Sequence, residues 1–185
     1  MRLARELLPL AEFDRRADLG EGGTPLVRLC RTAPPGVERW VKDESGNPTG
    51  SFKARGLSLA VNRARELGAP GVELPSAGNA ALALAAYAAA AGLPARVALP
   101  ADTPATIAGR CRLHGAEVLE GGRTLVDAAA LLSELSPAGG RLPDRSSGEL
   151  RLAHAASRRP GWTAPSPPVD ARARIRPRPS AFLPS

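Results

Sequence analysis

Lysine is scarce in this sequence. Lys42 and Lys53 are its only two lysines, and every other basic side chain is an arginine. Arginine stays protonated in proteins, so it rarely acts as a nucleophilic amine or as a proton carrier. Any amine chemistry must therefore come from Lys42, from Lys53 or from the amino terminus.

Cysteine and long apolar runs are scarce as well. Cys30 and Cys111 have no paired spacing, so the pattern predicts two ordinary buried thiols, with neither a disulfide framework nor a metal site. The first residues, 1–13, carry Arg and Glu and lack the apolar core of a signal peptide. The longest apolar stretch, Ala80–Ala91, is too short to span a bilayer. We therefore predict a soluble, cytoplasmic protein with no membrane partner.

The positive charge is concentrated near the end of the chain. Residues 137–185 hold nine basic and three acidic side chains, whereas residues 1–136 are almost balanced. A nucleic-acid-binding domain should carry a basic face within its folded part, so we predict no specific nucleic-acid partner. The same final segment holds nine of the nineteen prolines and shows no periodicity. It cannot bury enough apolar surface to offset its chain entropy, and we predict a disordered tail over 137–185.

The middle of the chain repeats one pattern. Three apolar-periodic segments close at Gly68, Gly92 and Gly115, and glycine is favoured just past the end of a helix. Each glycine is followed by a short β-like run. These runs are residues 72–74, 96–99 and 117–119. A repeated helix–turn–strand unit predicts an α/β fold with an open parallel sheet and flanking helices.

Periodicity and helix-start signals predict the helices more closely. Apolar residues from Leu57 to Leu67 recur at helical spacing. Thr103 before Pro104 is typical of an N-cap followed by proline in the first turn, and Thr124 with Asp127 resembles a capping box. The segment Ala80–Ala91 is small and apolar all round, which predicts a buried helix. A strand over residues 38–42 should lead into the turn at residues 47–50.

One turn places a lysine at the start of a helix. The segment Asn47–Gly56 has the sequence N-P-T-G-S-F-K-A-R-G, so Lys53 falls in the first helical turn. The helix dipole there disfavours a cation and favours the neutral, nucleophilic amine. That setting suggests Schiff-base chemistry. The alternative is a solvated lysine that merely tolerates its position. Lys42, beside Asp43 and Glu44, should instead stay protonated.

This segment resembles the lysine motif of the fold-type-II, or tryptophan-synthase-β-like, pyridoxal-phosphate (PLP) enzymes. Its form is most similar to that of the threonine synthases. Two flanking segments agree: residues 19–26, L-G-E-G-G-T-P-L, resemble a segment near the start of those enzymes, and residues 40–44 resemble the strand before their lysine loop. The resemblance implies that PLP is the cofactor, that Lys53 is the catalytic residue bonded to it, and that Phe52 contacts it.

A second motif lies between a predicted strand and the apolar helix. Its sequence is S-A-G-N-A, residues 76–80. Backbone N–H groups at such a helix start can hold an anion. By resemblance, the substrate carboxylate binds the loop formed by Ser76, Ala77, Gly78, Asn79 and Ala80, and Asn79 also hydrogen-bonds the cofactor. The alternative for Asn79 is a simple helix cap.

The resemblance covers residues 19–135, about a third of the length that a two-domain enzyme of this kind needs. It implies that residues 1–55 are a piece of the large domain and residues 56–136 the small α/β domain, so we expect a partial fold-type-II enzyme. We find no match for the family's glycine-rich phosphate loop or for its pyridine-nitrogen partner. Without the rest of the large domain, we expect uncovered apolar surface around Leu26–Leu29.

The resemblance also implies a reaction. In the family, Lys53 would hold PLP as an imine, exchange with the amine of O-phosphohomoserine and move protons while phosphate leaves and water adds to give threonine. Two alternatives stay open: a PLP-dependent Ser/Thr dehydratase, and a non-catalytic fragment made by truncation or frameshift. We expect a small-molecule substrate, and the family leaves room for a homodimer.

Overall fold

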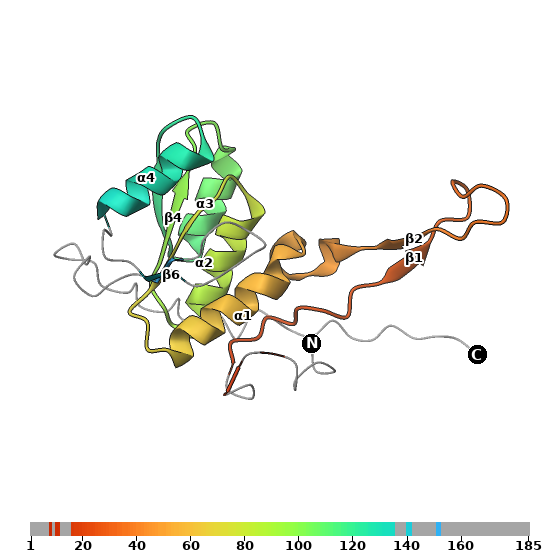
Figure 1. Cartoon of the computed structure of the whole chain (residues 1–185), viewed down its shortest axis with the longest axis horizontal. Helices are drawn as coiled ribbons and strands as arrows, with labels where there is room; N and C mark the ends of the chain where they lie inside the picture. The colour runs from red at the N-terminus through yellow and green to blue at the C-terminus, as the bar shows by residue number, and fades with distance from the viewer. Residues whose placement is uncertain (1–7, 9, 12–15, 136–139, 142–150, 153–185) are drawn as a thin grey trace.

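The computed structural model describes residues 8, 10–11, 16–135, 140–141 and 151–152, the last two pairs by their backbone alone. It begins with an antiparallel hairpin of β1 (Leu26–Arg28) and β2 (Trp40–Lys42), in which Val27 pairs with Val41. The hairpin projects away from the rest of the chain (Figure 1). Two single turns, η3 (Glu44–Gly46) and η4 (Pro48–Gly50), then lead to the first helix.

The remaining elements alternate as the glycine pattern predicts. They are α1 (Lys53–Glu66), β3 (Val72–Pro75), α2 (Asn79–Ala91), β4 (Ala95–Leu99), α3 (Ala105–Leu113), β5 (Glu117–Glu120) and α4 (Leu125–Leu135). The strands β3, β4 and β5 are parallel neighbours. This arrangement confirms the α/β class and the parallel sheet. Among the residues described, none of the helices is both long and apolar enough to cross a membrane.

The sheet carries an edge that the sequence did not predict. Two short strands, β6 (Gly140–Arg141) and β7 (Arg151–Leu152), extend it to the order β5-β4-β3-β7-β6. β7 runs antiparallel to β3, so the sheet is mixed rather than purely parallel. These four residues differ from the disordered tail expected over 137–185, and the rest of that segment lies outside the described residues.

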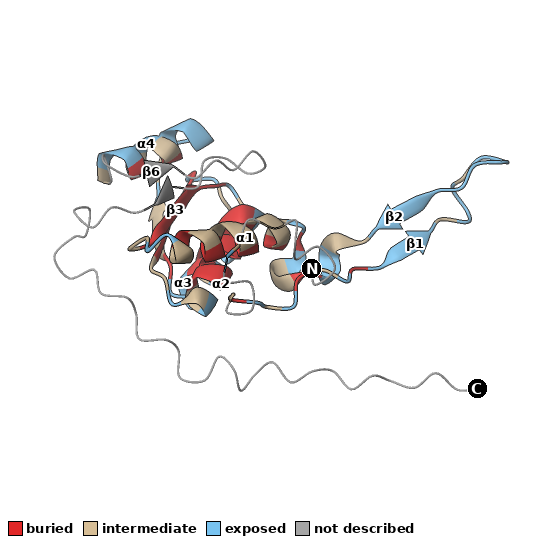
Figure 2. Cartoon of the chain, turned by 60° about the horizontal axis from the view of Figure 1, so that its bottom comes forward, coloured by how far each residue is buried: buried red, intermediate tan, exposed pale blue. Residues whose placement is uncertain are grey.

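The core lies between α1, α2 and α3 and one face of the sheet. Ala-rich α2 is buried from Ala80 to Ala88, and α1 packs along it. A smaller cluster on the opposite face joins Leu132 and Ala128 of α4 to Ala98. Figure 2 shows the buried residues gathered in this part of the molecule. The expected domain boundary at residues 55 and 56 falls inside α1 and stays a prediction.

A row of charges crosses the sheet on its α4 side. Arg96 of β4 donates to Glu73 of β3 (Nη1–Oε1, 2.7 Å) and to Glu117 of β5 (Nε–Oε2, 2.8 Å). The backbone register places these three residues opposite one another. The side chains of Arg96 and Glu73 are 1% and 0% exposed, so their charges are balanced by each other inside the protein rather than by water.

Helix starts agree only in part with the predictions. The α4 capping box is confirmed, because Thr124 N donates to Asp127 Oδ2 (2.9 Å) and Asp127 N donates to Thr124 Oγ1 (3.2 Å). The prediction that Thr103 caps α3 is wrong. Pro104 itself occupies the cap position, and the Thr103 hydroxyl, although shielded from solvent, bonds to no described residue. Proline fixes an extended entry here without a side-chain cap.

Candidate cofactor-binding site

The lysine turn has an unusual backbone. Gly50 N donates to Asn47 O (2.9 Å), which closes the turn. Thr49 inside it has a φ of 65°, in the left-handed region that a β-branched residue rarely adopts. Such a conformation persists only where the surroundings impose it, and it is found most often at functional sites. The turn contacts α2, so it lies against the helix that the second motif opens.

Lys53 begins α1, as predicted. Its side chain is half-buried, and its ammonium lies 5.0 Å from the centroid of the Phe52 ring. The ring face attracts a cation, whereas the helix start disfavours one, so two opposed effects act on this amine. Phe52 is 55% exposed and presents its ring to solvent beside the lysine.

A polar network beneath the turn connects all three resembling segments. Buried Asn47 accepts from Gly22 N (3.0 Å) and donates to Glu44 Oε2 (2.7 Å). Arg55, two residues after Lys53, donates to Glu44 Oε2 (2.7 Å) and to Thr24 Oγ1 (2.9 Å). The Arg55 hydrogen bond is the main reason that the pKa of Glu44 falls to about 2. The network fixes the turn that carries Lys53.

A second network is centred on Glu21, which is 5% exposed. Its carboxylate accepts from Ser58 Oγ on α1 and from Tyr87 OH on α2, both at 2.7 Å. Burial, together with this hydrogen bond, raises the pKa of Tyr87. Sequence analysis did not identify these contacts, because Ser58 and Tyr87 lie 37 and 66 residues from Glu21 along the chain. Glu21 thus joins the first segment to both helices of the site.

The other lysine is engaged elsewhere. Lys42 lies in β2, and its ammonium donates to the backbone carbonyl of Thr24. This contact holds the Lys42 amine in the hairpin, where it supports the strand pairing. The structure therefore separates the two lysines by role: Lys42 closes a backbone contact, and Lys53 opens a helix.

The Ser76–Ala80 loop forms the start of α2. Ser76 is buried, and its hydroxyl oxygen accepts from Gly78 N and Ala81 N, both at 3.3 Å. Gly78 is the N-cap, so Asn79 is not the cap considered as its alternative. The amides of Asn79 and Ala80 have no acceptor in the part of the chain that the structure describes. Ala77 and Asn79 are exposed, and the two amides remain as donors for an anion.

The cysteines and histidines lie in different environments. Cys111 is buried, which raises the pKa of its thiol to about 11. Cys30 is exposed, so the prediction of a buried thiol is wrong for this residue. His114 is the C-cap of α3, and desolvation of its ring together with the charge of Arg110 lowers its pKa. His154 lies outside the described residues. Within them, no group of His, Cys, Asp and Glu could hold a metal ion.

Comparison with known proteins identifies the family. The family model described as "Pyridoxal-phosphate dependent enzyme" matches residues 17–154, well over half of the chain. The chain belongs to the PLP-dependent enzyme family. The family's match covers both the lysine turn and the Ser76–Ala80 loop. PLP is therefore the cofactor that these residues have to fit.

Among curated members of the family, threonine synthases are similar to this chain. The enzyme of Halalkalibacterium halodurans is 43% identical over 118 residues, 63% of this chain and 33% of the relative. That of Methanosarcina acetivorans is 45% identical over 118 residues, 62% of this chain and 29% of the relative. The chain thus spans about a third of the length of these relatives.

A solved structure supports the same fold. A hydrogen sulfide-producing enzyme from Fusobacterium nucleatum superposes with a TM-score of 0.56 at 25% identity, over 62% of this chain and 40% of that one. Production of hydrogen sulfide differs from the activity of the threonine synthases, so family membership leaves the reaction open.

Proposed function

We propose that Lys53 is the residue that bonds PLP, and that this chain supplies the lysine-bearing part of a threonine synthase-like site. The observation that carries the proposal is the position of Lys53 on a turn held by Asn47, Glu44 and Arg55. A catalytic side chain must be held by a rigid surround to act in register with its substrate. The hydrogen bonds among Asn47, Glu44 and Arg55 make the turn before Lys53 rigid in this way.

Three groups of the described residues fit the cofactor. Lys53 offers an amine that is only half-buried, and Phe52 beside it offers an exposed aromatic face. Asn79 offers an exposed amide side chain one residue past the Gly78 cap. When bound, PLP supplies an aldehyde that an amine can attack and a ring that withdraws electrons from the substrate carbon.

The substrate carboxylate has a matching site in the second loop. The free amides of Asn79 and Ala80 start a thirteen-residue helix, whose dipole favours a negative charge. In this proposal Ser76 shapes the loop by accepting from Gly78 N and Ala81 N, and the two free amides bind the carboxylate. Lys53, once released from the cofactor, carries protons to and from the substrate carbons.

The relatives favour O-phosphohomoserine as the substrate, with threonine and phosphate as the products of a lyase-type reaction in threonine biosynthesis. The two relatives are threonine synthases, at 43% and 45% identity to this chain. The chain spans about a third of their length, and displacement of a reacting group by about 1 Å can cost 100-fold in rate. We therefore expect the chain alone to release little phosphate from O-phosphohomoserine.

The test is to incubate the purified chain with PLP, reduce it with borohydride and map the modified lysine by mass spectrometry. We expect the adduct on Lys53 and its loss in Lys53→Ala. Since the chain has two lysines, Lys42→Ala is a matched control that should keep the adduct. An adduct on Lys42, or one that persists in Lys53→Ala, would refute the assignment.

A further inference from the structure

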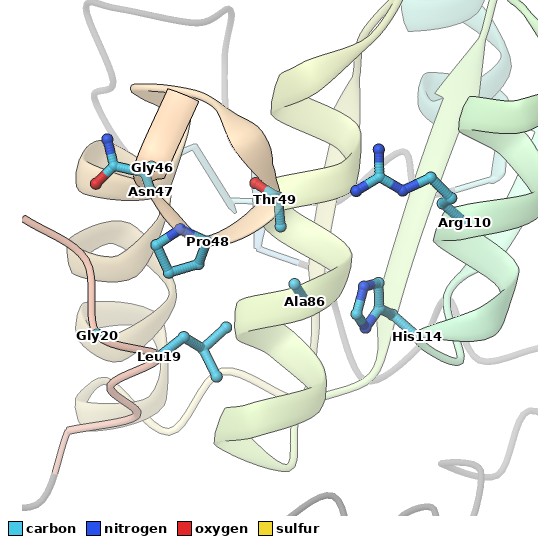
Figure 3. A pocket seen from close by; sticks show the side chains of 9 residues that line it. All are labelled: Leu19, Gly20, Gly46, Asn47, Pro48, Thr49, Ala86, Arg110 and His114. Carbon is cyan, nitrogen blue, oxygen red and sulfur yellow. The ribbon is translucent and has the colours of Figure 1, made fainter. Parts of the chain in front are cut away.

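A cavity lies beside the lysine turn. Its volume is about 440 Å³, within the range of small-molecule sites. Its walls are the Gly46–Thr49 turn and Leu19–Gly20 on one side and α3 on the other, with Ala86 of α2 as its floor (Figure 3). Lys53, Ser76 and Asn79 do not line it.

The α3 wall is cationic. Arg110 and His114, one helical turn apart, reach over α2 toward Thr49 and Ala86 (Figure 3). The lining residues include no Asp or Glu, so no carboxylate at the wall neutralises the guanidinium. The charge of Arg110 already acts on the imidazole, since it contributes to the lowered pKa of His114. An anion between the two groups would favour protonation of the imidazole.

Two neighbouring arginines of α3 are used differently. Arg112 points to Glu120 and forms an ion pair with it. Arg110 makes no hydrogen bond or ion pair with any residue in the described part of the chain, although its side chain faces the cavity in Figure 3. Across from it, the buried hydroxyl oxygen of Thr49 also has no described partner. The unpaired Arg110 guanidinium leaves hydrogen bonds for a ligand to complete.

We propose that this cavity binds a small-molecule oxyanion, a phosphate or carboxylate group, held by the Arg110 fork and by His114. A guanidinium matches such groups with two parallel hydrogen bonds, and His114 adds a third donor once it is protonated. The small Ala86 side chain leaves the floor open for the ligand. The site goes beyond the proposed cofactor function, because Arg110 and His114 have no role there.

The test uses the imidazole signals of the full chain, which has two histidines. Inorganic phosphate, and acetate in a parallel arm, are titrated at constant ionic strength while the pKa of each imidazole is followed by NMR. We expect saturable binding that raises the pKa of His114 and leaves that of His154 unchanged. The arm with the tighter binding distinguishes a phosphate from a carboxylate ligand.

Variants locate the site. Arg110→Gln should weaken binding at least tenfold, because it removes the guanidinium fork. The matched control Arg112→Gln removes the same charge from the same helix and should keep the affinity within twofold. Lys53→Ala should bind normally, which separates this site from the cofactor proposal. Equal weakening by Arg110→Gln and Arg112→Gln, or shifts that never saturate or that affect both histidines alike, would overturn the proposal.

Discussion

The helical body and the β1–β2 hairpin use similar residues in opposite ways. In the body, Leu74, Leu84 and Leu99 are fully buried, whereas in the hairpin Leu26 is 59% and Trp40 is 50% exposed (Figure 2). Leu26 and Val27 confirm the expected uncovered apolar surface. Burial of apolar area supplies most of the stability of a fold. The body should therefore account for nearly all of the unfolding free energy, and the hairpin for little of it.

The largest expected contrast concerns ion pairs. Arg96→Met in the sheet should lower the free energy of unfolding by about 3–5 kcal/mol, because it leaves Glu73 buried without its cation. Arg28→Met in the hairpin breaks a pair with exposed Glu38 and should cause no measurable change. Urea unfolding followed by circular dichroism measures both. Similar losses for the two variants would show that the hairpin is part of the cooperative fold.

Leucine truncation should separate the two regions almost as strongly. Leu84→Ala in α2 should cost about 2–5 kcal/mol, since it leaves a cavity in a packed core. Leu26→Ala removes the same atoms from an exposed strand and should cost far less. The same unfolding measurement applies, and an equal cost would mean that Leu26 is covered in solution, for example by a second copy of the chain.

The junction between the two regions should respond to acid. The pKa of Glu44 is lowered from 4.5 to about 2, so its contribution to stability is present above pH 4.5 and is lost as the pH falls toward 2. The melting temperature of the natural chain should fall more over this interval than that of Glu44→Gln. The exposed hairpin variant Glu38→Gln serves as the control and should follow the natural chain. Parallel curves for all three proteins would contradict a role for Glu44 at the junction.

The smallest effect should come from a helix start. Thr124→Ala removes one half of the α4 capping box and should cost about 1 kcal/mol. Thr32→Ala in the hairpin loop, where the backbone carbonyl rather than the side chain accepts from Arg39, should change stability by a few tenths at most. Thermal unfolding resolves the difference. An equal loss of stability in the two variants would show that the cap does not stabilise α4.

Local signals in the sequence predicted much of the body. Glycine positions and apolar spacing located α1, α2 and the parallel strands, because these elements are long or repeated enough to show a period. β1 was missed because three residues carry no clear alternation, and β6 and β7, at two residues each, carry none. Their pairing depends on the free edge of β3, which is a property of the assembled sheet.

The candidate site divides in the same way. Lys53 and the Ser76–Ala80 loop were predicted because their motifs are contiguous. The groups that hold them were not: Glu21 meets Tyr87 across 66 residues, and Arg55 meets Thr24 across 31. The cationic cavity was also missed, since its opposite walls come from the lysine turn and from the end of α3. Such contacts exist only after the helices pack.

The composition of α2 has a consequence for order. Nine of its thirteen residues are alanines, which have no rotamers to lose, whereas larger side chains would lose rotamer freedom when such a helix is buried. Burial of this helix therefore costs little side-chain entropy, and few alternative packings compete with the native one. α2 is accordingly a stiff reference surface, against which the lysine turn, the Ser76–Ala80 loop and the Arg110 cavity are all positioned.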